Sequence, residues 1–215
     1  MNFNVIAIDG PAASGKSTVA SQLAKRLGYT YVNSGAMYRA ITWKVCLSGA
    51  SVTNPDAIAA VLDESHIRIG AENGESFIRI DGFDPTPYLR DEQINRNVSP
   101  VSSVPAVREL LLGRLRAFAD EVDVVMEGRD IGSAVFPDTP FKFYIDASPE
   151  VRRQRRSAQG QTDEITFRDK ADSTRQSAPL TIADDAYVID SSHLTIDGVV
   201  GEIIGRLKLK GLAIS

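Results

Sequence analysis

Short apolar runs alternate with helical patterns along most of the chain. Five runs have the apolar, β-branched or aromatic character of buried strands: residues 3–8, 29–32, 122–126, 141–145 and 186–189. Helical spacing of apolar residues falls between them, at residues 18–27, 36–47, 51–64, 105–118, 149–157 and 197–209. Strands that alternate with helices indicate right-handed βαβ crossovers. The pattern therefore predicts an α/β fold, a five-stranded parallel sheet flanked by helices.

Three segments depart from this pattern. Residues 67–69 and 77–81 alternate apolar and polar positions around a turn cluster at 70–75, which predicts an antiparallel hairpin. We expect residues 66–90 to form a small inserted β lobe, for which a purely structural role is equally open. Residues 91–104 are polar, and we assign them no element. Residues 159–175 are charged without apolar periodicity, and we expect a mobile lid at about 157–177 within a core made of residues 1–65 and 91–215.

The first strand leads into a glycine loop of the form Gly-x-x-x-x-Gly-Lys-Ser, which runs from Gly10 to Ser17. A helix follows at once, so strand, loop and helix stand in the order that a phosphate-binding loop requires. Glycines allow the turn and the close approach of a phosphate, while backbone N–H groups point at the anion. We expect Lys16 to reach the β- and γ-phosphates and the Ser17 hydroxyl to ligate Mg²⁺.

Composition narrows the class of protein. The chain has 215 residues, 43% apolar and 24% charged, which suits one α/β domain with a small insert. A net charge of −4 argues against general binding to nucleic acid or to an anionic membrane. A lone cysteine, Cys46, excludes an intrachain disulfide and fits a reducing compartment. With neither a signal sequence nor an apolar run of membrane length, we expect a cytoplasmic protein, and nothing at the surface demands a partner, so we expect a monomer.

Arginines distinguish a kinase from other nucleotide-binding proteins. Polar clusters follow three of the expected strands, at residues 14–17, 33–39 and 127–130, so one edge of the sheet collects them. These clusters and the expected lid contribute four arginines, which are Arg39, Arg129, Arg168 and Arg175. Any one of them could be a solvated surface charge, but together they suit a reaction in which two polyanions meet. A phosphate acceptor is already ionised near neutral pH, so we assign no general base.

Three stretches carry a family resemblance: Ser34-Gly35-Ala36-Met37-Tyr38-Arg39, the run from Glu127-Gly128-Arg129-Asp130 to Pro137, and Asp172-Ser173-Thr174-Arg175 followed by Ala178-Pro179-Leu180. The chain resembles the bacterial cytidylate kinases nearly end to end. The resemblance implies a P-loop kinase core that transfers the γ-phosphoryl group of MgATP to CMP, and to dCMP as well. It also implies that the inserted hairpin is the monophosphate-binding lobe of the longer bacterial form.

The resemblance also implies a role for each matching residue. ATP phosphates would lie on Gly10, Pro11, Ala12, Ala13, Ser14, Gly15, Lys16, Ser17 and Thr18. The CMP site would comprise Ser34, Tyr38, Arg39, Ser99, Arg108, Arg129, Asp130, Arg168, Asp172 and Arg175. Within it, Arg39, Arg129 and Arg175 would hold phosphate and, with Lys16, form the catalytic set. Ser99, Arg108 and Asp130 would read the cytosine edge, and Arg168 and Asp172 would meet the ribose.

Two departures from the family pattern stand out. Glu127 occupies a position where aspartate is usual, and the expected lid is shorter than the family's. Ala171 also stands where the family's lid motif has its second arginine. We hypothesise that Arg152, Arg153 and Arg156 supply the cationic surface that the lid lacks.

Two other functions compete with the leading one. A kinase for a different small acceptor would use the same loop and the same arginines. A nucleotide-dependent switch would hydrolyse slowly and need a protein partner. A GTPase switch would be expected to carry a guanine-reading Asn-Lys-x-Asp stretch, and the chain contains none.

Overall fold

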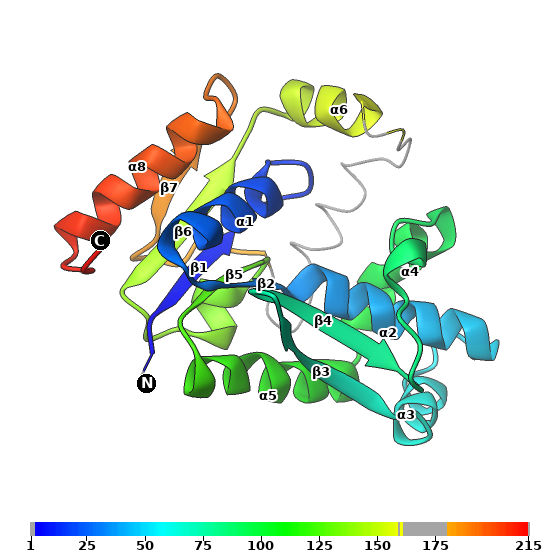
Figure 1. The fold of residues 1–215 in the computed structure, drawn as a ribbon. Helices are drawn as coiled ribbons and strands as arrows, with labels where there is room; N and C mark the ends of the chain where they lie inside the picture. Colours follow the sequence, from blue (N-terminus) through cyan, green and yellow to red (C-terminus); the bar gives the residue numbers. More distant parts are fainter. Residues whose placement is uncertain (1–2, 159, 161–179, 215) are drawn as a thin grey trace.

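The structure, a computed structural model, describes residues 3–158, 160 and 180–214. Its parallel strands stand in the order β2-β5-β1-β6-β7, which confirms the predicted five-stranded parallel sheet (Figure 1). Their bounds are β1 Val5–Asp9, β2 Thr30–Asn33, β5 Val124–Gly128, β6 Phe141–Asp146 and β7 Tyr187–Asp190. The first strand lies at the centre, where the direction of winding reverses, so the loop after it begins at the usual ligand-binding point of such sheets.

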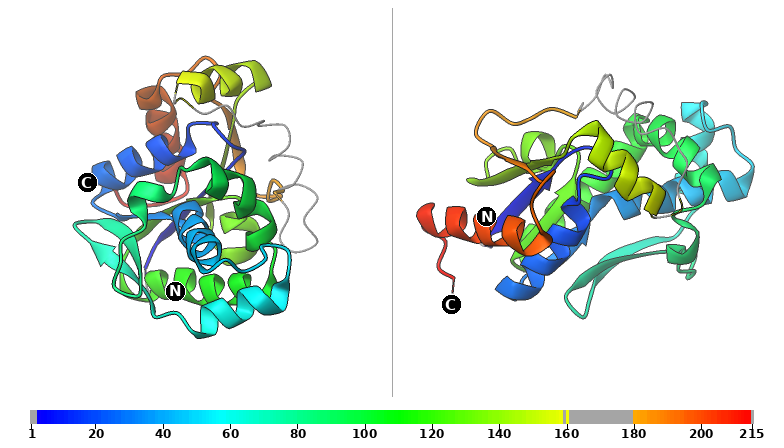
Figure 2. Two further views of the ribbon diagram at one scale, coloured as in Figure 1. Left: turned by 90° about the vertical axis from the view of Figure 1, so that its right-hand side faces the viewer. Right: turned by 90° about the horizontal axis from the view of Figure 1, so that it is seen from above.

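Helices cover both faces of the sheet because its central strands are apolar on both. In β1, Ile6 and Ile8 pack against α1 (Lys16–Leu27) and α8 (Ile196–Leu209), while Val5 and Ala7 face the opposite core. That second face is covered by α2 (Ser34–Ser48), α3 (Pro55–Asp63) and α5 (Pro105–Glu121), as Figures 1 and 2 show. Near-continuous apolar strands of this kind are typical of buried parallel sheets. Among the helices of the described segments, none is long and apolar enough to cross a membrane.

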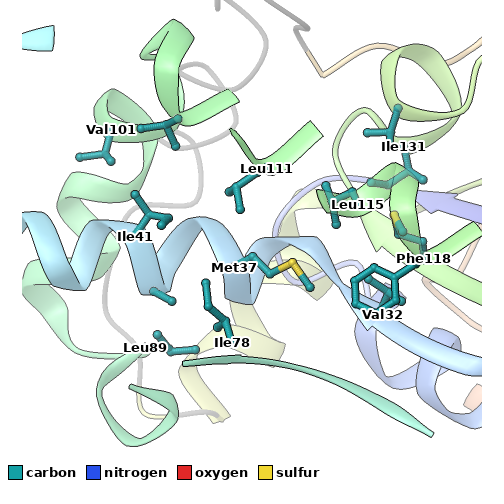
Figure 3. Packing of buried hydrophobic residues seen from close by; sticks show 14 of the residues in the cluster. Val32, Met37, Ile41, Ile78, Leu89, Val101, Leu111, Leu115, Phe118 and Ile131 are labelled. Carbon is teal, nitrogen blue, oxygen red and sulfur yellow. The ribbon is translucent and has the colours of Figure 1, made fainter. Parts of the chain in front are cut away.

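The predicted hairpin forms from β3 (Ile67–Glu72) and β4 (Glu75–Ile80), which pair antiparallel. It is continuous with the main sheet, because Glu75 pairs with Tyr31 of β2 and makes a seven-stranded sheet. Ile78 and Ile80 are buried in the same core as α2. Figure 3 shows Ile78 and Leu89 on one side of α2, with Val101 and Leu111 on the other. The hairpin therefore shares the core, and its role as a separate monophosphate-binding lobe stays a prediction.

A helix occupies most of the stretch that we assigned no element. This helix, α4, runs over Glu92–Ser102 and buries Ile94, Val98 and Val101 at helical spacing. Only about one apolar residue per turn faces the core, and Pro100 lies inside the helix. The sequence pattern therefore resembled that of a loop. Helix α3 begins at Pro55, and Asn54 caps it by accepting hydrogen bonds from the N–H groups of Asp56 and Ala57.

The connection after the hairpin is fastened to α2 by three aromatic rings. Trp43 of α2 stacks on Phe83 with ring centroids 5.2 Å apart, and Tyr88 lies 6.2 Å from Trp43. Tyr88 ends a 3₁₀ turn over Thr86–Tyr88, and α4 begins shortly after it. Offset aromatic contacts add stabilisation beyond the area that they bury. The stack therefore sets where the chain enters α4.

Truncation of Leu111 tests this core. Its side chain on α5 is fully buried in the core that it shares with α2, so Leu111→Ala should lower the free energy of unfolding by about 2–5 kcal/mol through lost burial and a cavity. Leu209, which is 80% exposed, gives the matched control, and Leu209→Ala should change stability by about 0.5 kcal/mol or less. Urea denaturation measures both, and equal losses would contradict the packing.

Candidate active site

The glycine loop joins β1 to α1 at the centre of the sheet edge (Figure 1). Gly10 approaches β6 so closely that an added Cβ would lie 2.1 Å from the carbonyl oxygen of Ile145. Gly15 has φ 92°, in the left-handed region, and no described side chain caps the helix that follows it. An uncapped helix N-terminus attracts anions through its N–H groups and its dipole. The loop therefore has the geometry of a phosphate site.

Lys16 is folded across this loop. It is the first residue of α1, it is 7% exposed, and its Nζ donates to the carbonyl oxygen of Pro11 at 2.9 Å. A buried ammonium needs an acceptor, and the carbonyl oxygen of Pro11 provides one. An arriving phosphate would offer the same ammonium a charged acceptor in place of a neutral one.

Next to Lys16, the Ser17 hydroxyl meets an acidic residue of the neighbouring strand. Ser17 Oγ donates to Glu127 Oε1 at 2.8 Å, and Glu127 is 3% exposed at the end of β5. Burial, and secondarily the charge of Glu127, raises the pKa of the Tyr31 phenol well above its usual range. Ser17 and Glu127 thus place a hydroxyl and a carboxylate together beside the phosphate loop.

The loop is connected to the segment after β5 through Asp9. The two carboxylate oxygens of Asp9 accept hydrogen bonds from the N–H groups of Ile131 and Gly132, each at 2.8 Å. In the opposite direction, Arg129 NH1 donates to the carbonyl oxygen of Gly10 at 2.9 Å. Burial raises the pKa of Asp9 to about 7, although the two backbone N–H groups oppose this shift. These contacts fix the phosphate loop and the 129–132 segment relative to each other.

A second group of side chains comes from α2. Asn33 caps this helix by accepting from the N–H of Ala36, and Ser34 Oγ donates to the carbonyl oxygen of Glu127 at 2.8 Å. Farther along the helix, Arg39 NH1 donates to the carbonyl oxygen of Leu89 at 2.8 Å. The start of α2 is therefore held against β5, and Arg39 is held against the chain that enters α4.

Tyr38, Arg108 and Asp130 form a largely buried polar group beside these residues, of which Asp130 is the most buried. Arg108 of α5 makes an ion pair with Asp130, and the two side chains are 11% and 5% exposed. The guanidinium carbon of Arg108 lies 5.9 Å from the centre of the Tyr38 ring. Arg108 NH1 is buried and finds no hydrogen-bond partner among the described residues. An unsatisfied buried donor is costly, so this nitrogen is well placed to bind an arriving acceptor atom.

One cavity of about 420 Å³ connects the two groups. The phosphate loop forms one part of its wall, with Lys16 and Ser17. Ser34, Tyr38 and Arg39 form another part, and the segment after β5 contributes Glu127, Arg129 and Asp130. The phosphate loop and the arginines thus line one shared space.

The sequence matches the cytidylate kinase family over residues 6–209. A cytidylate kinase of Pseudomonas savastanoi pv. phaseolicola is 41% identical to this chain over 223 residues, which cover 97% of each protein. A cytidylate kinase of Caldanaerobacter subterraneus subsp. tengcongensis is 43% identical over 214 residues, 94% of each. One of Streptococcus suis is 42% identical over 215 residues, 94% of this chain and 96% of that protein.

The chain belongs to the cytidylate kinase family. Membership makes it a transferase of the kinase type, which uses ATP as a phosphoryl donor. The cavity fits this chemistry, because phosphoryl transfer depends on positioning and on charge stabilisation more than on covalent participation.

Most residues expected in a cytidylate kinase site line the cavity, but some do not. Gly10, Pro11 and Ser14 belong to the loop but do not line the cavity. Arg108 does not line it either, although its ionic partner Asp130 does. Ser99 is 9% exposed on α4 and does not line the cavity, whereas Ser102 of the same helix does. Three predicted residues lie outside the described residues: Arg168, Asp172 and Arg175.

The hypothesis on the arginines of α6 (Pro149–Ala158) stays a prediction, and the structure places its three members differently. Arg153 is exposed and pairs with Glu150 at 3.0 Å on the helix surface. Arg156 lines the cavity, and Arg152 NH1 donates to the carbonyl oxygen of Ala12 at 3.3 Å. Helical periodicity explains the split, since residues 152 and 156 share one face of the helix and 153 points elsewhere.

Sequence reasoning missed several residues of this site. Arg155 donates to the carbonyl oxygens of Ser14 at 3.1 Å and of Ser191 at 2.8 Å, which braces the phosphate loop from outside. Asp9 and Glu127 were visible as acids at the ends of adjacent strands, a position that could have marked them. For Arg155 and Ser191 the signal was absent, because only the folded chain brings them to the loop.

Replacement of Asp9 tests its ionisation. The pKa of Asp9 rises from 3.8 to about 7 on folding, so the folded state binds a proton more tightly than the unfolded state. This contribution to stability is complete below about pH 4 and is lost as the pH rises through about 7. The stability of the native chain relative to Asp9→Asn should therefore fall between pH 5 and pH 7, by at most about 1.4 kcal/mol per pH unit. Denaturant titrations of both proteins measure this difference, and a constant value would contradict it.

Proposed function

We propose that the protein transfers the γ-phosphoryl group of ATP to CMP, and also to dCMP, giving ADP and the cytidine diphosphate. One observation carries the proposal. A single cavity is lined by a phosphate loop and by the residues that the family resemblance assigns to a monophosphate site, among them Arg39, Arg129 and Asp130. The cytidylate kinases of related bacteria support the choice of acceptor.

Donor binding follows from the loop. Backbone N–H groups of residues 12–18 would surround the β-phosphate, and Lys16 would exchange the carbonyl of Pro11 for phosphate oxygens. A bound Mg²⁺ would neutralise charge between the β- and γ-phosphates. The donor set fits this ion, because the Ser17 hydroxyl and the Glu127 carboxylate are hard oxygen ligands placed together.

Acceptor binding would depend on the arginines. Arg39 and Arg129 would hold the CMP phosphate, joined by Arg175 from outside the described residues. Guanidinium groups offset the repulsion between the two polyanions and stabilise the charge of the transferring phosphoryl group. We assign no general base, because the acceptor phosphate is largely ionised near neutral pH.

Recognition of cytosine would use the buried ion pair. Asp130 can accept a hydrogen bond from the exocyclic amine of cytosine, whereas the corresponding oxygen of uracil would be repelled. The unsatisfied NH1 of Arg108 can donate to a ring acceptor, and Ser99 would complete the base site by family resemblance. Arg168 and Asp172 would bind the ribose. The proposal also includes the sequence-based expectation of a monomeric cytoplasmic enzyme.

An acceptor panel tests the function. With MgATP and each nucleoside monophosphate, we expect CMP and dCMP to give diphosphates, measured by chromatography together with ADP release. Lys16→Ala should lower the rate by about 10²–10³-fold, as loss of a positioned charge does at other sites. Lys25→Ala, an exposed lysine of the same helix, is the matched control and should keep full activity. A different preferred acceptor, or slow ATP hydrolysis that no acceptor stimulates, would contradict the proposal.

Asp130→Asn tests the base assignment separately. The amide can donate to the uracil oxygen, so the ratio of kcat/KM for CMP to that for UMP should fall about 10- to 100-fold, the value of one charged hydrogen bond. Because Arg108 loses its ionic partner, thermal unfolding should be compared at the same time. An unchanged ratio in a folded variant would show that Asp130 does not read the base.

A further inference from the structure

Asp130 stands at the start of a short helix of unusual type. A π-helix covers Ile131–Val135 and directly follows Asp130. The N–H groups of Ala134 and Val135 both donate to the carbonyl oxygen of Asp130, at 2.9 and 3.1 Å. Single π-turns of this kind are frequent at functional sites. The backbone of Asp130 is thus part of this hydrogen-bonded unit, so the position of its carboxylate depends on where the π-helix lies.

The sheet holds the first residues of the π-helix. Ile131 and Gly132 donate their N–H groups to the carboxylate of Asp9. Gly132 also packs against Lys142 of β6, because an added Cβ would lie 3.1 Å from the Cγ of that lysine. Close packing on this side leaves the start of the π-helix little room to shift.

The other end of the π-helix is held by Arg116 of α5. Its Nε donates to the carbonyl oxygen of Val135 at 2.9 Å, and its Nη2 donates to that of Ala134 at 3.1 Å. The last carbonyls of a helix lack partners within it, and the fork of a guanidinium can satisfy two of them at once. An acid therefore holds the N–H end of the π-helix, and a base holds the carbonyl end.

Two peptide groups connect Arg116 to the start of the π-helix. The group between Ala134 and Val135 accepts from Arg116 through its oxygen and donates to the carbonyl oxygen of Asp130 through its N–H. The next peptide group repeats this arrangement one residue farther along. Hydrogen bonds in such a chain strengthen one another. Removal of the guanidinium should therefore loosen the contacts that end at Asp130.

Helix α5 reaches Asp130 at a second point as well. Arg108, on the first turns of α5, pairs with the carboxylate of Asp130. Arg116 lies about 12 Å farther along the same helix, at 1.5 Å per residue, and holds the backbone that Asp130 begins. One helix thus fixes both the side chain and the backbone of the residue that we propose as the reader of the base.

We propose that Arg116 is a positioning residue for base selection, which holds the π-helix so that the carboxylate of Asp130 faces the base of the acceptor nucleotide. The inference rests on the proposed function, in which Asp130 reads cytosine. Arg116 is exposed and does not line the cavity, so it acts through the π-helix and not on the substrate. Its removal should change the choice of acceptor and leave donor binding on the phosphate loop as it is.

Replacement of Arg116 tests this role through substrate choice. Arg116→Ala should lower the ratio of kcat/KM for CMP to that for UMP roughly 3- to 10-fold, the value of one net hydrogen bond. The KM for MgATP should stay within about 2-fold of the native value. A merely structural role would lower the temperature of unfolding without changing the ratio. An unchanged ratio in the folded variant would therefore overturn the proposal.

Arg114→Ala is the matched control. Arg114 is an exposed arginine of the same helix, so its replacement removes the same charge from the same region. We expect its ratio within about 2-fold of the native one, and equal losses in the two variants would mean a general field effect and refute the proposal. Arg116→Lys keeps the charge but not the fork, so its ratio should fall between those of the native protein and Arg116→Ala.

Asp130→Asn decides whether Arg116 acts through Asp130. In the Asp130→Asn background, Arg116→Ala should change the ratio less than about 2-fold, because the carboxylate that it positions is absent. A double-mutant cycle measures this coupling. Independent losses that multiply would mean that Arg116 influences substrate choice by another route, against the proposal. If Arg116→Ala does not fold, Arg116→Gln and Arg114→Gln carry the same comparison.

Failure of this inference can be separated from failure of the proposed function. If the native protein prefers a nucleotide other than CMP, the function is wrong, and the same variants are measured for that nucleotide against its nearest competitor. A loss of this preference in Arg116→Ala alone, absent in the Asp130→Asn background, would still support the positioning role. If CMP is preferred and Arg116→Ala keeps the native ratio, the function stands and Arg116 is excluded.

Discussion

A buried carboxylate holds the two parts of the site together. Asp9 ends the central strand, and its oxygens accept from the N–H groups of Ile131 and Gly132 on the far side of β5. Burial of a charged carboxylate costs free energy, and for this reason burial raises the pKa of Asp9 to about 7. The contact nevertheless fixes the loop that begins at Gly10 against the turn that carries Arg129. Phosphoryl transfer depends on such fixed distances, because the two phosphates must be aligned before reaction.

The part of the cavity that we propose as the acceptor side is built differently, from segments that are far apart in the sequence. Helix α2 contributes Arg39, and the chain between the hairpin and α4 contributes Arg90. These segments meet through Asn95 and through the apolar contacts of α2 with Ile78 and Leu89, which Figure 3 shows. The donor side thus depends on the rigid centre of the sheet, and the acceptor side depends on side-chain contacts at its edge.

Local patterns were sufficient for the sheet and for the loop. The five strands, the hairpin and the phosphate loop all depend on periodicity or on glycine spacing that a short window contains. Helix α4 was not predicted from the sequence, because its buried face is narrow and Pro100 resembles a helix break. Ile94, Val98 and Val101 are nevertheless spaced for a helix. The contacts of Arg90, Asn95 and Arg155 could not be predicted at all. Each joins residues whose proximity exists only after the hairpin and α6 have packed onto the core.

The aromatic stack on α2 has a consequence for observing this enzyme. Trp43 is the chain's single tryptophan, and it stacks on Phe83 and Tyr88 where the hairpin passes into α4. Indole emission depends on the polarity and the contacts around the ring, so the tryptophan fluorescence of the protein reports on this one joint. The joint adjoins the backbone that carries Arg90 and receives Arg39. The single tryptophan is thus an optical reporter for the joint between the hairpin and α4, next to the backbone that receives Arg39.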